Sequence, residues 1–244
     1  MGVYLKVCFV YKLVRVHYNK TTGMTEKANQ FTGPKQYLEK SFLEELNYKI
    51  WSTKASRFNA DKRLKTKAKI SNISLAFLSA YLIIASLISV YNINTGNSEN
   101  IINYIITALS ILVLVVSQFE NAQDYKLNAR IFHDCGLELS VLYNDLRVFK
   151  TLKSKPSDYE VYTFAKNLSE KYQTVLRNYQ NHSPIDYDMF QINNVTYFEK
   201  VAPEKVTPEN IKEVNRRYLW EIYGWYSVMI ILPPILILGI LLIY

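Results

Sequence analysis

The stretch from Ile70 to Val90, ISNISLAFLSAYLIIASLISV, decides the fold of this 244-residue chain. It contains no Asp, Glu, Lys, Arg or His, so a helix built from it is uncharged around its whole perimeter. At a rise of about 1.5 Å per residue, the stretch is about 30 Å long, which matches the hydrocarbon core of a bilayer. A buried helix of a soluble protein fits an uncharged perimeter of this length poorly. The stretch therefore predicts a transmembrane helix.

Two further apolar blocks follow in the chain. Residues 91–100, YNINTGNSEN, form a short polar link to a second uncharged run at residues 101–119, IINYIITALSILVLVVSQF. Spans joined by so short a link must cross in opposite directions, so we expect a transmembrane helical hairpin. The third block, residues 223–244, contains Pro233-Pro234 near its middle. Because proline removes backbone donors, we expect a kinked C-terminal span, with a re-entrant or interfacial segment as the alternative.

Basic residues are concentrated before the first span, and this asymmetry predicts the orientation. Residues 1–69 hold 15 Lys and Arg against 5 Asp and Glu, whereas the link at 91–100 holds no Lys or Arg. Cytoplasmic flanks carry the excess of Lys and Arg, so we place residues 1–69 in the cytosol and the protein in the bacterial inner membrane as a multi-pass protein. The run abuts a span, which favours a role in topology over nucleic-acid binding. The topology-determining residues are Lys62, Arg63, Lys65, Lys67 and Lys69.

The polar parts of the chain also have helical patterns. Residues 37–69 lack Gly and Pro and predict one long helix that runs into the first span. We expect later helices to begin at a Ser157–Glu160 capping box and at Thr207-Pro208, with residues 181–206 irregular between them. After the second span, apolar residues step by three and four, which predicts that the second span continues as a cytosolic stalk that packs on the helix before the hairpin or on a neighbouring subunit. These seam residues are Phe132, Cys135, Leu139, Leu142, Leu146 and Phe149.

The fold class that these patterns predict is an all-α membrane protein with three parts. Residues 1–36 form an N-terminal segment, residues 37–195 a domain with the hairpin, and residues 196–244 a C-terminal helix with the expected third span. Residues 1–23 lack the features of a signal peptide, and Met24 is the expected start of the native protein. Both cysteines, Cys8 and Cys135, are expected to be free thiols, because the cytosol is reducing.

No residue pattern predicts a catalytic, cofactor-binding or metal site, so we expect the protein not to be an enzyme. His133 and Cys135 are two residues apart, which on a helix points them to different faces. His182 lies near Asp186 and Asp188, a combination that can do acid–base work. A Ser-Pro turn explains the same residues more simply. The sequence contains no phosphate-binding glycine loop and no nucleophile elbow.

Small polar residues recur along the expected spans. Asn72, Ser79 and Ser86 are seven residues apart and share one helix face, with Ser89 on the adjoining edge. Such residues allow helices to pack closely; the sharper hypothesis is a polar path lined by several copies of the chain. The candidate pore-facing or helix-packing set is Asn72, Ser79, Ser86, Ser89, Ser110 and Ser117. The absence of charge in the spans argues against a proton-coupled transporter or a voltage sensor.

Several strings in the chain resemble a known family. These are FLEELNYKIWSTKASRFNADKRLKTKAKISNISLAFLSAYLIIASL, then QFENAQDYKLNARIFHDCGLELSVLYNDL after the hairpin, and NHSPIDYDMFQ. Together they resemble the SLATT family, the SMODS and SLOG-associating two-transmembrane effector domains, and most closely its fifth subfamily, over residues 37–195. The resemblance implies a membrane effector of bacterial conflict systems, encoded beside nucleotide-signal or reverse-transcriptase modules, that oligomerises and opens a pore to kill or arrest the infected cell.

The sequence thus leads to one main expectation and two competing ones. The main one is a homo-oligomeric effector that permeabilises the inner membrane when a cytosolic sensor, such as a nucleotide-signal or reverse-transcriptase module, activates it. The first alternative is a non-conducting membrane scaffold that tethers a cytosolic defence or signalling complex. The second is a membrane-bound enzyme that uses the loop from His182 to Asp188.

Overall fold

The computed structural model describes residues 41–90 and 99–243, and every regular element within these ranges is a helix. The longest is α2, Phe42–Val90, whose 49 residues are unbroken. It confirms, over its described length, the long helix that was expected to run into the first span. Because the backbone hydrogen bonds are continuous, α2 joins the charged part of the chain to its apolar part as one rigid element.

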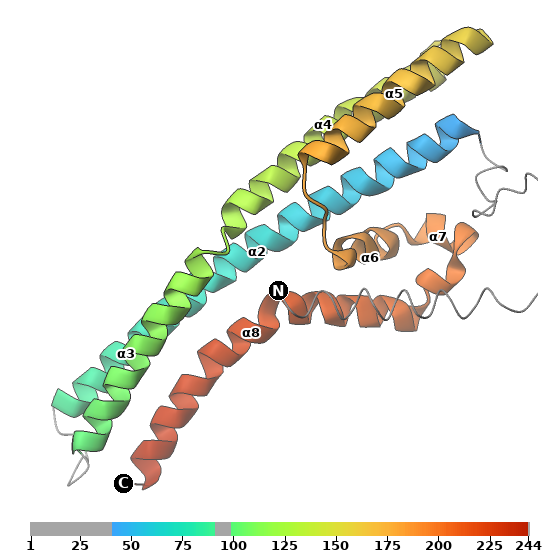
Figure 1. Ribbon diagram of the computed structural model, residues 1–244. Helices are drawn as coiled ribbons and strands as arrows, with labels where there is room; N and C mark the ends of the chain where they lie inside the picture. Colours follow the sequence, from blue (N-terminus) through green and yellow to red (C-terminus); the bar gives the residue numbers. More distant parts are fainter. Residues whose placement is uncertain (1–40, 91–98, 244) are drawn as a thin grey trace, which may run out of the picture. The chain divides into compact units, whose positions relative to one another are not determined.

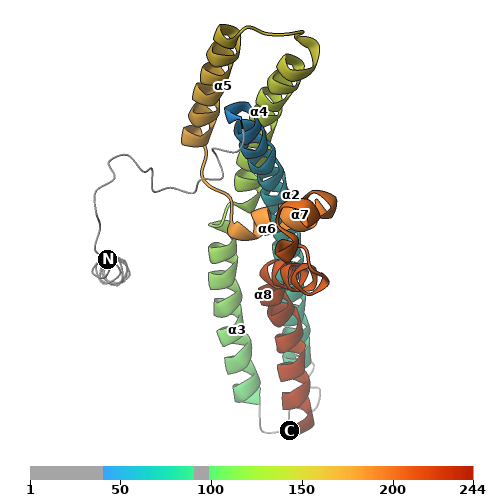
Figure 2. The same cartoon turned by 90° about the vertical axis from the view of Figure 1, so that its right-hand side faces the viewer.

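Helix α3, Glu99–Asn121, runs in the opposite direction beside the C-terminal half of α2 (Figures 1 and 2). A hydrogen bond from Ser71 Oγ to Glu120 Oε2, 2.8 Å long, joins the start of the apolar part of α2 to the end of α3. Most of the expected polar link, residues 91–98, lies outside the described residues.

Two helical stretches of the described chain are long and apolar enough to cross a membrane, Phe42–Ile88 and Asn103–Leu152. Only 22% and 6% of their most apolar windows are buried. The core helix of a soluble protein hides such a window inside the fold, so this exposure fits a surface that faces lipid. The expected third span lies in α8, Pro208–Ile243, which continues as a helix through Pro233 and Pro234. Its kink and its membrane crossing stay predictions.

A turn at residues 122–124 separates α3 from the next helix, α4, Tyr125–Leu152. Asp124 has a φ of 46°, in the left-handed region, which ends the continuous helical path. The expected stalk is therefore a separate helix. It ends at Leu152, and α5, Asp158–Asn178, begins at the predicted capping box, where Ser157 N donates to Glu160 Oε2 at 2.9 Å.

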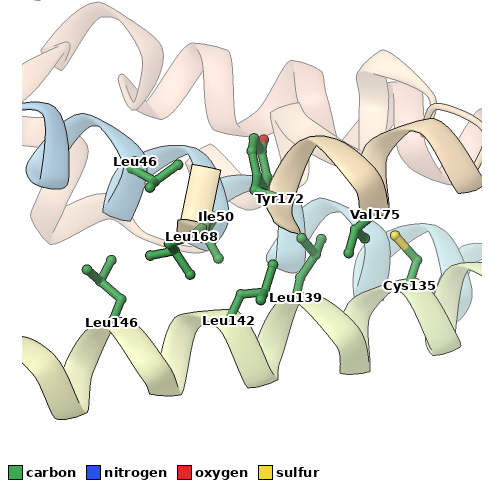
Figure 3. Close-up of a cluster of buried hydrophobic side chains, with 9 residues drawn as sticks. All are labelled: Leu46, Ile50, Cys135, Leu139, Leu142, Leu146, Leu168, Tyr172 and Val175. Atoms are coloured by element: carbon green, nitrogen blue, oxygen red, sulfur yellow. The ribbon is translucent and has the colours of Figure 1, made fainter. Parts of the chain in front are cut away.

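The main apolar core lies between α2, α4 and α5 (Figure 3). The predicted seam of α4 is confirmed: Cys135, Leu139 and Leu146 are completely buried, and Figure 3 shows them beside side chains of the other two helices. Cys135 is a free thiol within this core. The neighbouring residues in the core are Leu46 and Ile50 from α2, Leu142 from α4, and Leu168, Tyr172 and Val175 from α5.

The prediction that residues 181–206 are irregular was wrong. They contain α6, Pro184–Ile192, then α7, Val195–Val201, and a 3-10 turn, Pro203–Lys205. Helices this short show little periodicity and are stabilised by packing, which sequence reasoning cannot see. Here the ring centroid of Phe190 on α6 lies 4.7 Å from the ring centroid of Trp51 on α2 and 5.6 Å from the ring centroid of Phe198 on α7.

The last helix, α8, begins where the sequence predicted. Asn210 N donates to Thr207 Oγ1 at 3.2 Å, which caps its first turn. The side chain of Val214 is buried with Ile185 and Ile192 of α6. Since α6 also contacts α2, this short helix lies against both long helices that lead into apolar stretches.

Candidate functional site

The described residues contain a buried ion cluster where α2, α6 and α8 meet. Arg63 of α2 binds the Asp186 carboxylate through two hydrogen bonds, Nε to Oδ1 and Nη2 to Oδ2, each 2.8 Å long. Its third nitrogen, Nη1, donates to Glu221 Oε1 of α8, also at 2.8 Å. Lys67 Nζ lies 3.6 Å from the same Glu221 oxygen. We call Arg63, Lys67, Asp186 and Glu221 the Arg63 cluster.

Local structure positions each member of the Arg63 cluster. Arg63 and Lys67 are four residues apart on α2 and therefore share a face. Asp186 lies in the first turn of α6, where its Oδ2 also accepts a hydrogen bond from Ser183 N at 3.1 Å. The backbone carbonyl of Asp186 accepts another from Asn59 Nδ2 of α2, at 3.0 Å. The carboxylate is thus held at the helix N-terminus, which favours negative charge, and points at Arg63.

Burial makes this cluster sensitive to the loss of a partner. Asp186 is 0% exposed and Arg63 is 6% exposed. Two cations and two carboxylates leave the cluster formally neutral, which a water-poor site requires. Burial also lowers the pKa of Lys67, an effect that the charge of Glu221 opposes. Removing one member would leave a buried charge without compensation.

A second polar cluster lies one helical turn further along α2. The Glu120 carboxylate of α3 is 5% exposed. It accepts hydrogen bonds of 2.8 Å from Ser71 Oγ of α2 and from the Tyr226 hydroxyl of α8. The Tyr125 hydroxyl of α4 lies 3.4 Å from that of Tyr226. We call Ser71, Glu120, Tyr125 and Tyr226 the Glu120 cluster.

The two clusters are aligned on one face of α2. Arg63, Lys67 and Ser71 are spaced by four residues, so about 12 Å of helix separates the first from the last. Both clusters also include α8, through Glu221 and Tyr226. Hydrogen bonds and ion pairs therefore connect α6, through the two clusters, to α2, α3 and α8. The clusters lie at the ends of the expected spans that the sequence placed next to the cytosol.

A buried arginine, Arg57, and a half-buried histidine, His182, lie beside the Arg63 cluster. Arg57 of α2 is 0% exposed and donates through Nη1 to Gln180 O and through Nη2 to Asn181 Oδ1. Its pKa is lowered chiefly by burial. Burial also lowers the pKa of His182, and the positive charge of Arg57 adds to the effect. His182 is therefore held in its neutral form at neutral pH.

The acidic residues that the sequence placed near His182 have separate partners. Asp186 is bound by Arg63, whereas Asp188 lies 3.1 Å from Arg217 at a more exposed position. His133 Nδ1 lies 3.2 Å from Asp61 Oδ2 of α2, whereas Cys135 is buried in the apolar core with α5, so the two side chains have different surroundings. Within residues 41–90 and 99–243, no three His, Cys, Asp or Glu residues gather as a metal site would require.

The candidate polar face of the spans is not packed within the single chain. Ser79 and Ser110 are exposed, and each hydroxyl donates to a carbonyl of its own helix, at 3.0 and 2.6 Å. Asn72 is exposed, Ser86 and Ser117 are half-buried, and the Ser89 side chain lies outside the described residues. The buried polar residues of this part of α2 are instead Ser71 and Ser74. An apolar stretch gives no sequence signal of which face is covered, so these serines were missed.

The five basic residues before the first span have different environments. Arg63 and Lys67 belong to the Arg63 cluster, and Lys65 Nζ lies 2.9 Å from Asp61 Oδ1. Lys62 and Lys69 are exposed. The sequence grouped these residues by charge alone, because it gave no sign of the distant carboxylates, Asp186 and Glu221, that bind Arg63 and Lys67.

The regular elements of residues 41–90 and 99–243 are all helices, and two stretches among them are long and apolar enough to cross a bilayer, which fits the class of helical membrane proteins. The profile of the SMODS and SLOG-associating 2TM effector domain family 5 matches residues 39–240, and the chain belongs to this family. The resemblance seen in the sequence is confirmed, and the match extends past residue 195, where it was expected to end, into α8. A search of curated proteins and a search of solved structures found no match.

We expect Arg63→Met to destabilise the protein by about 3–5 kcal/mol, because it leaves Asp186 buried without a counter-charge. The matched control is Arg217→Met, which removes the more exposed partner of Asp188 and should cost about 0–1 kcal/mol. Urea unfolding of the purified protein in detergent measures both values. Equal losses of unfolding free energy in the two variants would contradict a structural role of the Arg63 cluster. The double variant Arg63→Met/Asp186→Leu should recover much of the stability that Arg63→Met loses, because it leaves no unpaired charge at this position.

His182 should make the stability depend on pH. Its pKa in the folded chain lies below the ordinary value of 6.5, so the unfolded chain binds more protons between these two values. Stability is therefore lost as the pH falls below about 6.5, and the stability gap between wild type and His182→Gln should be larger at about pH 7.5 than at about pH 5.5. If the difference in stability between wild type and His182→Gln does not change with pH, the fold does not hold the His182 imidazole in its neutral form.

Proposed function

We propose that this chain is a membrane effector of a bacterial conflict system that permeabilises the inner membrane when it is activated. The family to which it belongs consists of two-transmembrane effector domains. Two helical stretches are long and apolar enough to span, and they expose most of their apolar surface. Both observations support a protein that acts in the membrane.

In this proposal α2 and α3 cross the membrane as a hairpin, and the charged half of α2 lies in the cytosol. Lys62 and Lys69, which are exposed, remain available to interact with anionic lipid headgroups and hold this orientation. The apolar part of α8 is the third crossing. Its aromatic entry supports this assignment, because Trp220 and Trp225 are exposed near the expected membrane boundary.

The observation that carries the proposal is the Arg63 cluster. It connects α6, a short helix of the cytosolic part, with α2 and α8, and α2 and α8 share the Glu120 cluster with α3. A signal that displaces α6 would withdraw Asp186 and leave Arg63 buried with only part of its counter-charge. The spans would then rearrange to restore a partner or water to Arg63, because an uncompensated buried charge costs several kcal/mol. The Arg63 cluster is thus the coupling element between sensing and opening.

The opened state is proposed to be an assembly of several copies around a polar path. Asn72 and Ser79 are exposed in the single chain and lie on one face, so they are free to meet other copies. The function needs no catalysis, and the two aspartates near His182 are bound by arginines. We therefore propose a non-enzymatic effector. Its trigger would be a cytosolic sensor, such as a nucleotide-signal or reverse-transcriptase module, and nucleic acid is not proposed as a direct partner.

The first test compares wild type with Ser79→Leu/Ser86→Leu in bacterial cells, by membrane potential and propidium entry at matched protein level. Activated wild type should depolarise the cells, and the variant should not, because two leucines close the polar path. Ala80→Leu, which makes a similar gain in size to each of the two serine substitutions at an exposed position of the same helix, is the control and should leave leakage unchanged. Leakage by the double variant would contradict the pore face, and an activated wild type that never leaks would favour the scaffold.

The second test addresses coupling. Asp186→Asn removes the charge that holds Arg63, whereas Asp188→Asn removes the neighbouring, more exposed carboxylate. At an expression level where wild type is silent, Asp186→Asn should cause depolarisation without a trigger, and Asp188→Asn should not. If both variants behave as wild type, with and without the trigger, the Arg63 cluster does not control opening.

A further inference from the structure

A small apolar cavity lies between the apolar parts of α2, α3 and α8. Its volume is about 150 Å³, and all three helices contribute to its lining, with Leu82 from α2, Val113 from α3 and Met229 from α8. The described residues that line it include no charged side chain. Its walls therefore favour an uncharged, apolar occupant over an ion or a polar ligand.

The cavity follows from the way in which the three helices pack. Within the described residues, α3 and α8 each lie against α2 but have little contact with each other (Figures 1 and 2). The Glu120 cluster joins α8 to α3 through Tyr226, and Trp225, the preceding residue, lines the cavity. Pro233, further along α8, lines it as well. The cavity thus extends for about 12 Å along α8, from the Glu120 cluster to the middle of the expected third span.

Size and polarity decide what can occupy this cavity. Apolar cavities of this size exclude water and bind molecules about as large as benzene. A helix is about 10 Å across, so no helix of a second copy fits. A lipid acyl chain is apolar, only one methylene wide, and the main component of the hydrocarbon core that would surround the expected spans. Among water, a helix and an acyl chain, only the acyl chain matches both the volume and the lining.

The cavity has an exposed rim and a buried floor. Leu112 of α3 and Val228 of α8 line it and are 55% and 47% exposed. Met229, which also lines it, is only 7% exposed. Because the rim residues face the surroundings of the expected spans, an acyl chain of a neighbouring lipid can enter sideways between α3 and α8. Contact with Met229 then marks a chain inside the cavity rather than one on the protein surface.

We propose that this cavity binds the acyl chain of a bilayer lipid, which fills the space between α3 and α8. In a membrane, helices associate through close packing and hydrogen bonds, so the atoms that line an empty space lose contacts that nothing else replaces. A bound chain supplies these contacts and holds α8 beside α3 beyond the Glu120 cluster. The inference rests on the proposed crossing of the membrane by α2, α3 and α8, and it adds a lipid ligand to the proposed function.

The test uses the full chain in nanodiscs of phosphatidylethanolamine and phosphatidylglycerol, with a small share of a phospholipid that carries a diazirine in one acyl chain. After illumination, peptide mass spectrometry should find the label on Met229. Val113→Phe, which fills the cavity, should lower this labelling at least fivefold. The control is Val115→Phe, the same substitution at an exposed position of α3, which should leave the labelling of Met229 unchanged.

The labelled positions separate a failure of this site from a failure of the proposed function. Equal labelling of Met229 in wild type and Val113→Phe would overturn the inference, as would a wild type labelled at Val115 but not at Met229. A wild type labelled on none of the three helices would show that they do not lie in the bilayer, which overturns both the site and the proposed function. Labelling of Met229 in a chain that never depolarises cells, even when activated, would support the lipid site and contradict only the pore.

A second measurement guards against a variant that misfolds. Val113→Phe should keep the helical circular dichroism of wild type. In detergent, added phospholipid should raise the midpoint of thermal unfolding by about 2–4 °C in wild type and in Val115→Phe, because it binds the folded chain. The rise should be at most half as large in Val113→Phe, whose cavity is filled. A folded Val113→Phe variant with the full rise would overturn the site.

Discussion

The bidentate ion pair between Arg63 and Asp186 is the interaction on which the arrangement of the helices depends. It lies where α2, α6 and α8 meet, and both side chains are buried. Such a pair contributes little net stability compared with a well-packed apolar contact, but it tolerates no other geometry. Its value to the protein is therefore specificity: α6 and α8 must both be in place for Arg63 to have its full set of carboxylate partners.

The two halves of α2 are held by different forces. In the charged, N-terminal half, burial of apolar side chains such as Ile50 against α4 and α5 drives the packing. In the apolar half lipid competes equally well for such surface, so helix association there relies on close packing and hydrogen bonds. The Glu120 cluster supplies hydrogen bonds at the boundary between the charged and the apolar half of α2. A change in the apolar core between α2, α4 and α5 can thus reach the apolar stretches through the polar contacts of the Glu120 cluster.

Helix α4 connects the apolar core with the second apolar stretch. Its inner face completes the core with α2 and α5. Because α4 follows directly on α3 after the turn at Asp124, a shift of α4 within the core would also move the end of α3. The Tyr125 hydroxyl at the start of α4 lies 3.4 Å from that of Tyr226 on α8, so the same shift would reach the Glu120 cluster.

The sequence by itself determined the long helices, the two uncharged stretches, the seam of α4 and the caps of α5 and α8. These features are local or periodic, so a single stretch of residues carries the signal. Only the tertiary structure decided that residues 181–206 are helical, that Arg63 and Lys67 bind carboxylates, and that Ser71 and Ser74 face inward. Arg63 and Asp186 are 123 residues apart in the chain, and neither is unusual in its own segment. Their pairing depends on a fold that brings three helices to one point, which no local pattern encodes.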